Sequence, residues 1–183
     1  AMSTVMLDEK AEGTLKKLLL SPIRPSDILF GKMISVNVIS MMQLTVMFLF
    51  GWFVFGLDIL PHIPSLVLMI FCTSFACSAF GVFLVSFAKS KSQASGLSTL
   101  VILTMSAIGG SMIPSFVMPA FMQKLSIFSV NYWGIQGFYD IFWRELSITD
   151  PIFLMRVLVL LGIGVLLNLI AVRLFKRNVL SLI

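Results

Sequence analysis

A few residues of this chain have the types that catalysis, metal binding or nucleotide binding would need. Gly31-Lys32 resembles the end of a phosphate-binding loop, Gly-x-x-x-x-Gly-Lys-Ser/Thr, but Met33 stands in the hydroxyl position and Ser26 in the first glycine position. The single His62 cannot build a histidine-based zinc site, and neither a His-Glu-x-x-His nor a Gly-x-Ser-x-Gly pattern occurs. We therefore expect no catalytic residue, no metal site and no nucleotide site in this chain.

The remaining thiol and acidic side chains also lack a reactive arrangement. Cys72 and Cys77 lie five residues apart in one apolar stretch, which on a helix points them about 140° apart. This spacing fits neither a Cys-x-x-Cys motif nor a disulfide within the helix, so we expect both to be buried small residues. The four acidic residues after Lys32 fall at the edges of apolar stretches: Asp58, Asp140, Glu145 and Asp150. A proton relay inside a membrane span is therefore not expected.

The composition places the chain in a membrane. Hydrophobic residues make up 58% of its 183 residues and charged residues only 11%, so a soluble domain would leave much apolar surface exposed. The uncharged stretch from Met33 to Leu57 would reach about 37 Å as a helix, more than the roughly 30 Å hydrocarbon core. The net charge of +5 indicates basic loops facing the cytoplasm rather than a nucleic-acid surface. We expect an all-α polytopic membrane protein.

Charges, glycines and prolines divide the chain into two regions. Residues 1–32, with nine charges between Asp8 and Lys32, are expected to be cytoplasmic, and residues 33–183 to form the transmembrane domain. The expected spans are residues 34–57, 65–88, 93–112 and 152–175. Residues 113–143 are apolar and aromatic but interrupted, which fits either a re-entrant or interfacial element or a further crossing.

The basic residues favour the first interpretation of residues 113–143. With four spans, ten basic residues face the cytoplasm and three, Lys124, Arg144 and Arg156, face outward, as the positive-inside bias requires. A fifth crossing would move the cluster from Arg173 to Arg177 outside. We therefore expect a multi-pass protein of the cell membrane with both chain ends cytoplasmic. Arg156 and Arg173 are expected to extend toward water at the ends of the last span.

The segment before the first span is amphipathic. On a helix, Leu15, Leu18 and Leu19 share one face, with Lys16 and Lys17 elsewhere. Composition alone favours a helix that lies on anionic lipid.

The order of residues gives this segment a second interpretation. Glu9-Lys10-Ala11-Glu12-Gly13-Thr14-Leu15, then Leu18-Leu19 and Pro22, resembles the pattern at the coupling helix of ABC-2 type exporter permeases, which are subunits of ATP-binding cassette (ABC) transporters. Gly109-Gly110, Pro114 and Pro119 resemble the break that ends the fifth span of those permeases. Asn131-Tyr132-Trp133 resembles their outer re-entrant region.

This resemblance implies roles and partners. A coupling helix would contact the ATP-binding subunit through seven residues: Glu9, Glu12, Gly13, Thr14, Leu15, Leu18 and Leu19. The family has six spans, so these four would be its third to sixth, and the chain is expected to be the last two-thirds of a permease. The implied partners are an ABC subunit that carries ATP and Mg, a second permease copy that is identical or related, and the lipid bilayer. No cofactor on this chain and no nucleic-acid partner are expected.

A stripe of small and polar residues marks the third span. It consists of Ser95, Thr99, Ile102, Ser106 and Gly109, which recur near the helical period, with Met105 beside it. Such a stripe fits close helix packing or the lining of a translocation path, and the resemblance favours the path. Gly110, Pro114 and Pro119 would then form a gate at its outer end. The predicted function is a permease subunit of an ATP-driven exporter; the alternative is a non-transporting assembly or anchoring subunit.

Overall fold

Helices form the regular structure in the part of the chain that the structure describes. This computed structural model describes the backbone of residues 25–88 and 90–180, and the side chains from residue 30 to 174 apart from residues 89 and 91. In chain order, the elements are α3 (Pro25–Phe55), η1 (Leu60–His62), α4 (Ile63–Ser86), α5 (Lys91–Ile108), η2 (Ser115–Val117), α6 (Ala120–Ser126), α7 (Val130–Phe142) and α8 (Pro151–Leu180). The all-α polytopic class predicted from the sequence is confirmed.

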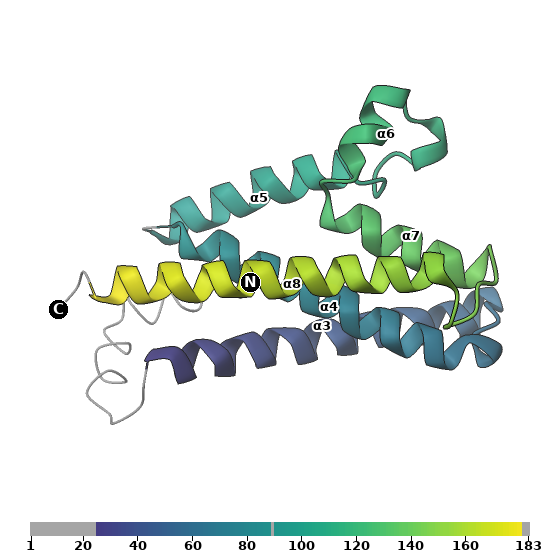
Figure 1. Ribbon diagram of the computed structural model, residues 1–183, viewed down its shortest axis with the longest axis horizontal. Helices are drawn as coiled ribbons and strands as arrows, with labels where there is room; N and C mark the ends of the chain where they lie inside the picture. The colour runs from purple at the N-terminus through teal and green to yellow at the C-terminus, as the bar shows by residue number, and fades with distance from the viewer. Residues whose placement is uncertain (1–24, 89, 181–183) are drawn as a thin grey trace.

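The long helices alternate in direction along the bundle. In Figure 1, the start of α3, the connection from α4 to α5 and the end of α8 all lie on the left. We call this the near end. The turn between α3 and α4 and the loop between α7 and α8 lie together on the right, at what we call the far end. This arrangement follows from the short connections between helices, which make sequential neighbours antiparallel.

Within residues 25–88 and 90–180, three helices are long and apolar enough to cross a membrane. Their apolar parts are Phe30–Phe55, Leu60–Ser86 and Pro151–Leu174, and Ser92–Ile108 is a shorter apolar helix. The expected span at residues 93–112 is therefore shorter as a helix: α5 ends at Ile108, because Gly110 has a φ of 92° and leaves the helical conformation. The domain boundaries and the assignment of each helix to a span stay sequence predictions.

Residues 113–143 form short helices instead of one long helix. The seven residues of α6 and the thirteen of α7 reach only about 10 Å and 20 Å, less than the roughly 30 Å hydrocarbon core. Figure 1 shows α6 standing away from the bundle and α7 leading back to the far end, where α8 begins. Their lengths agree with the expected helical element before the last span.

Helix α4 supplies the centre of the core. Its Met69, Cys72 and Ala76 are buried together with Phe153, Val157 and Leu160 of α8 and Val130 and Ile141 of α7. Small side chains on α4 allow α8 to approach closely, as in other membrane helix pairs. At the contact, a Cβ atom at Gly164 would lie 2.5 Å from Cδ1 of Phe75 and 3.5 Å from Cα of Ala76.

The two cysteines differ in their surroundings. Cys72 is buried in the core, as expected, but Cys77 is exposed, so the expectation that both are buried is wrong. The reason is the angle of about 140° between residues five apart on a helix, which turns Cys77 away from α8. Both are free thiols.

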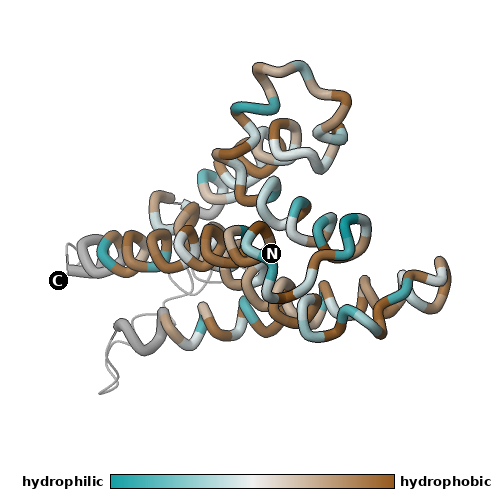
Figure 2. The backbone as a smooth tube through the Cα atoms, turned by 45° about the vertical axis from the view of Figure 1, so that its right-hand side comes forward, coloured by the Kyte–Doolittle hydropathy of each residue, from teal (hydrophilic) through white to brown (hydrophobic). Residues whose placement is uncertain are grey.

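The outer surfaces of the long helices are apolar. Figure 2 shows hydrophobic residues along their length, and on α3 the side chains of Phe50, Phe53 and Phe55 are 58%, 77% and 79% exposed. Apolar surface on this scale is typical of contact with lipid or with another membrane subunit.

Two glycines on α8 offer a matched test of this packing. A methyl group added by Gly164→Ala would overlap Phe75 and separate α8 from α4, whereas Gly162→Ala adds a methyl group where no atom lies within 4 Å. We expect Gly164→Ala to cost about 1–3 kcal/mol of stability and Gly162→Ala to be neutral or slightly stabilising. Thermal unfolding of both variants in the same detergent measures the difference. Equal melting temperatures for the two would contradict the close α4–α8 contact.

Candidate functional site

The predicted path residues lie on α5, and their exposure changes along the helix. Thr99 and Ile102 are exposed, Met105 and Ser106 are half-buried, and Gly109 is buried. In Figure 1, α5 diverges from the bundle formed by α3, α4 and α8. The stripe therefore runs from an open surface in the middle of α5 to a contact at its far end.

The break after α5 begins with two glycines of different roles. The backbone N–H of Gly109 donates to the carbonyl oxygen of Met105 at 2.8 Å, which is the last α-helical hydrogen bond. Gly110 then adopts a φ of 92°, in the left-handed region that favours glycine. Pro114 and Pro119 directly precede η2 and α6. The four residues thus lie within one connection, and together they stop α5 and start the two short helices.

The end of α5 is bonded to the start of α7. The Ser129 hydroxyl donates to the Met105 carbonyl oxygen at 3.0 Å, and the side-chain amide of Asn131 donates to the hydroxyls of Ser106 at 3.3 Å and Ser111 at 3.2 Å. These five residues form what we call the α5–α7 junction. Each neutral hydrogen bond of this kind contributes about 0.5–1.5 kcal/mol, so the junction can both form and open within a working cycle.

Gly109 makes this close approach possible. A Cβ atom at this position would overlap the Ser129 hydroxyl oxygen and come within 3.0 Å of Cβ of Asn131. Any larger residue would push α7 away from α5 and lengthen the hydrogen bonds of the α5–α7 junction. The buried end of the predicted stripe is therefore a packing contact, while its middle is exposed in the part of the chain that the structure describes.

Two glycines on one face of α7 fix this helix against α4. Gly134 and Gly137 lie three residues apart, on the same side of the helix. A Cβ atom at Gly137 would overlap the side chain of Met69, and one at Gly134 would lie 3.1 Å from Cγ2 of Thr73. Further along α7, the ring of Phe138 lies 4.8 Å from that of Phe48 on α3. Helix α7 is thus supported by α3 and α4 while its first residues hold α5.

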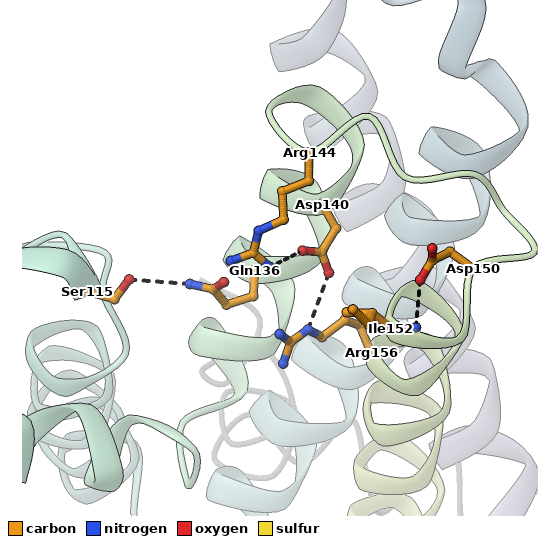
Figure 3. A network of polar contacts seen from close by, with 7 residues as sticks. All are labelled: Ser115, Gln136, Asp140, Arg144, Asp150, Ile152 and Arg156. Atoms are coloured by element: carbon orange, nitrogen blue, oxygen red, sulfur yellow. Dashed lines mark hydrogen bonds and ion pairs between the residues drawn. The ribbon is translucent and has the colours of Figure 1, made fainter.

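A buried carboxylate joins α7 to α8. Asp140 on α7 is fully buried, and Figure 3 shows it between two arginines. Nη1 of Arg144 lies 2.6 Å from Oδ1, and Nε of Arg156 on α8 lies 3.3 Å from Oδ2. We call these three residues the Asp140 cluster. Removing one partner of a buried ion pair costs about 3–5 kcal/mol, because it leaves a buried charge unpaired, whereas the loss of one neutral hydrogen bond at the α5–α7 junction costs less.

The Asp140 cluster corrects the expectation for Arg156. Its side chain is only 11% exposed and points toward Asp140, whereas the sequence suggested that it extends to water. Its guanidinium carbon also lies 5.2 Å from the ring centroid of Trp133 and 5.9 Å from that of Tyr132, a favourable cation–π arrangement. A buried carboxylate and two aromatic faces together stabilise the inward conformation.

The structure brings together some of the predicted site residues and adds others. Met105, Ser106 and Gly109 meet at the α5–α7 junction, and Gly110 is next to them; Thr99 and Ile102 are on the open part of α5. Sequence reasoning did not assign Ser111, Ser129 or Asn131 to the site. For Asn131 a signal was available: its side-chain amide is next to an apolar stretch, where a polar group needs a hydrogen-bond partner.

The remaining predicted residues cannot be placed. The seven coupling residues, between Glu9 and Leu19, lie outside the described residues. Within residues 25–88 and 90–180, no group of three or more His, Cys, Asp or Glu side chains is arranged to hold a metal ion.

Comparison with known proteins bears on the same regions. The profile of the ABC-2 type transporter family matches residues 1–143. This range includes the amphipathic segment, the break after α5 and α7. An inner membrane transport permease, YhhJ, of Escherichia coli K12 is 30% identical over 128 residues, and so is the YhhJ permease of Shigella flexneri.

The matched residues are a larger share of this chain than of each permease. The 128 residues are 68% of this chain but 33% of each permease, so the chain spans about a third of the curated relatives it matches. No solved structure matches the chain. With a family profile that covers 143 of its 183 residues and helices that can span a membrane, the chain belongs to the ABC-2 type transporter family of membrane permeases.

Proposed function

We propose that this chain forms the translocation path of an ATP-driven exporter and that a separate ATP-binding subunit, which carries ATP and Mg, supplies the energy. The observation that supports this most is that α5 is exposed along its stripe and hydrogen-bonded at one end. Its stripe is exposed at Thr99 and Ile102, while its far end is held at the α5–α7 junction by three side-chain hydrogen bonds. A helix held at one end and open along one face is suited to line a path that a small rotation opens.

The complete path is proposed to need a second permease copy, identical or related. The exposed stripe of α5 would then face the path between the two copies, and the apolar surface of α3 would face the partner subunit or lipid. In this arrangement the near end of the bundle faces the cytoplasm. It carries the basic residues Lys32 and Arg173, in accordance with the positive-inside bias.

Energy input is proposed at the segment from Glu9 to Leu19, which lies outside the described residues. Its apolar face, Leu15, Leu18 and Leu19, would seat in a groove of the ATP-binding subunit. Closure of two such subunits would press on this segment, and because it precedes α3 closely in the sequence, the bundle would tilt. The α5–α7 junction and the break from Gly110 to Pro119 would then open toward the far end.

The coupling role can be tested with a substitution at the apolar face. Leu18→Asp places a charge where a buried leucine is needed, so we expect a loss of at least about tenfold in ATP-dependent export. Lys17→Gln, on a different face, is the matched control and should keep most activity. Transport and ATP hydrolysis are measured on the permease reconstituted with its ATP-binding subunit. Full export by the Leu18→Asp variant, or failure of any ABC subunit to copurify, would favour the anchoring alternative.

The path role is tested by water access to α5. Ile102 and Leu100 are 50% and 66% exposed, but residues two apart on a helix point about 160° apart. In a Cys72→Ala/Cys77→Ala background of the assembled transporter, we expect Ile102→Cys to react with a membrane-impermeant maleimide at least about tenfold faster than Leu100→Cys. A thiol in lipid does not ionise, and only the thiolate reacts. Equal rates, or protection of Ile102→Cys in all nucleotide states, would indicate helix packing instead.

A further inference from the structure

The Asp140 cluster has more positive than negative charge. Asp140 contributes one negative charge, and Arg144 and Arg156 contribute two positive charges. Glu145 and Asp150 are nearby in the sequence, but among the described residues neither forms an ion pair with these arginines; Asp150 accepts a hydrogen bond from the backbone N–H of Ile152. The cluster itself therefore keeps an excess charge of +1.

Arg156 has donors that Asp140 does not use. Only Nε of Arg156 bonds to the carboxylate. Its two terminal nitrogens have no hydrogen-bond partner among the described residues, and they are not sealed from solvent. Figure 3 shows them turned away from Asp140. One edge of the guanidinium is thus fixed by the protein, and the other presents a fork of donors that fits two oxygens of a phosphate or carboxylate.

Aromatic rings define the walls of this site. Trp133 and Tyr132 lie beside the guanidinium of Arg156, and the indole N–H of Trp133 donates to the carbonyl oxygen of Ile127 at 2.8 Å, which fixes the ring. Tryptophan and tyrosine favour the depth of lipid headgroups. Arg156 is five residues from Pro151, where α8 begins, or about 7.5 Å along the helix axis. The free donors therefore lie within two turns of the far-end terminus of α8, from where a long arginine side chain can reach the headgroup region.

We propose that Arg156, supported by Arg144 and walled by Trp133 and Tyr132, binds the phosphate of an anionic group at the far end of the bundle. The Asp140 carboxylate orients Arg156 through Nε and at the same time limits its affinity for a second anion. An anionic phospholipid headgroup and a soluble phosphate ester share this chemistry. Occupancy of the site would bridge α7 and α8 and so stabilise the support of the α5–α7 junction.

The test measures binding of defined lipids to the purified chain. Native mass spectrometry in detergent gives apparent affinities for phosphatidylglycerol and, as the uncharged comparison, phosphatidylcholine. Arg156→Gln is expected to weaken phosphatidylglycerol binding about tenfold, the equivalent of one charge-assisted hydrogen bond. Arg156→Lys keeps the charge but loses the forked pair of donors, so its affinity for phosphatidylglycerol should lie between those of wild type and Arg156→Gln. Arg173→Gln on the near-end half of α8 is the matched control and should change the affinity by less than about twofold.

Asp140→Asn separates ligand binding from a purely structural role. This variant removes the competing charge, so phosphatidylglycerol should bind more tightly by several-fold even though the melting temperature falls. If the cluster serves only to hold α7 on α8, affinity and melting temperature fall together, which overturns the proposal. Equal binding by wild type and Arg156→Gln, or equal loss in Arg173→Gln, also overturns it.

The source of the phosphate is decided by competition. Glycerol phosphate and inorganic phosphate are added at millimolar concentration to the lipid-bound protein. If they displace phosphatidylglycerol in an Arg156-dependent manner, the site accepts soluble phosphate; if they do not, it is a lipid site. Either result supports binding of a phosphate at Arg156. The proposal does not depend on transport, because the binding measurement requires neither ATP nor the ATP-binding subunit.

Discussion

The far end of this protein depends on the pairing of one buried carboxylate. Asp140 has no exposed surface, and an ionised carboxylate in such surroundings is stable only with positive partners and hydrogen bonds. Arg144 follows the end of α7 and Arg156 is on α8, so Asp140 has both of its positive partners only when α7 and α8 are packed together. This requirement gives α7 a defined position, although its thirteen residues are too few for a stable isolated helix.

The fixed position of α7 determines where α5 ends. The glycines of α7 allow it to lie against α4, and its first residues then present Ser129 and Asn131 to α5. Strength decreases along this sequence of contacts. A charged, buried cluster holds α7 to α8, while neutral hydrogen bonds of about 1 kcal/mol each hold α5 to α7.

The sequence predicted the features that depend on local composition. Uncharged stretches gave the long helices, and Gly109-Gly110 with Pro114 and Pro119 located the end of α5 to within four residues. Contacts between distant residues were not predictable in this way. Asp140 was expected only as a carboxylate at the edge of an apolar stretch, but it is buried and bonded to Arg156, sixteen residues away. Likewise, the hydrogen bonds of Ser129 and Asn131 span 24 and 25 residues, and the periodicity of one helix contains no information about them.

The stripe on α5 shows why packing and path are not exclusive interpretations. At Gly109, a small residue is needed because α7 is in contact, and a side chain there would overlap Ser129. Ten residues earlier, at Thr99, the stripe is exposed among the described residues. A small residue is therefore required at Gly109 for a contact within the chain. Toward the middle of α5, the polar Thr99 is directed at the surroundings of the chain. A helix with both properties on one face can rotate about its fixed end and change what the open part of that face contacts, without loss of the core formed by α4 and α8.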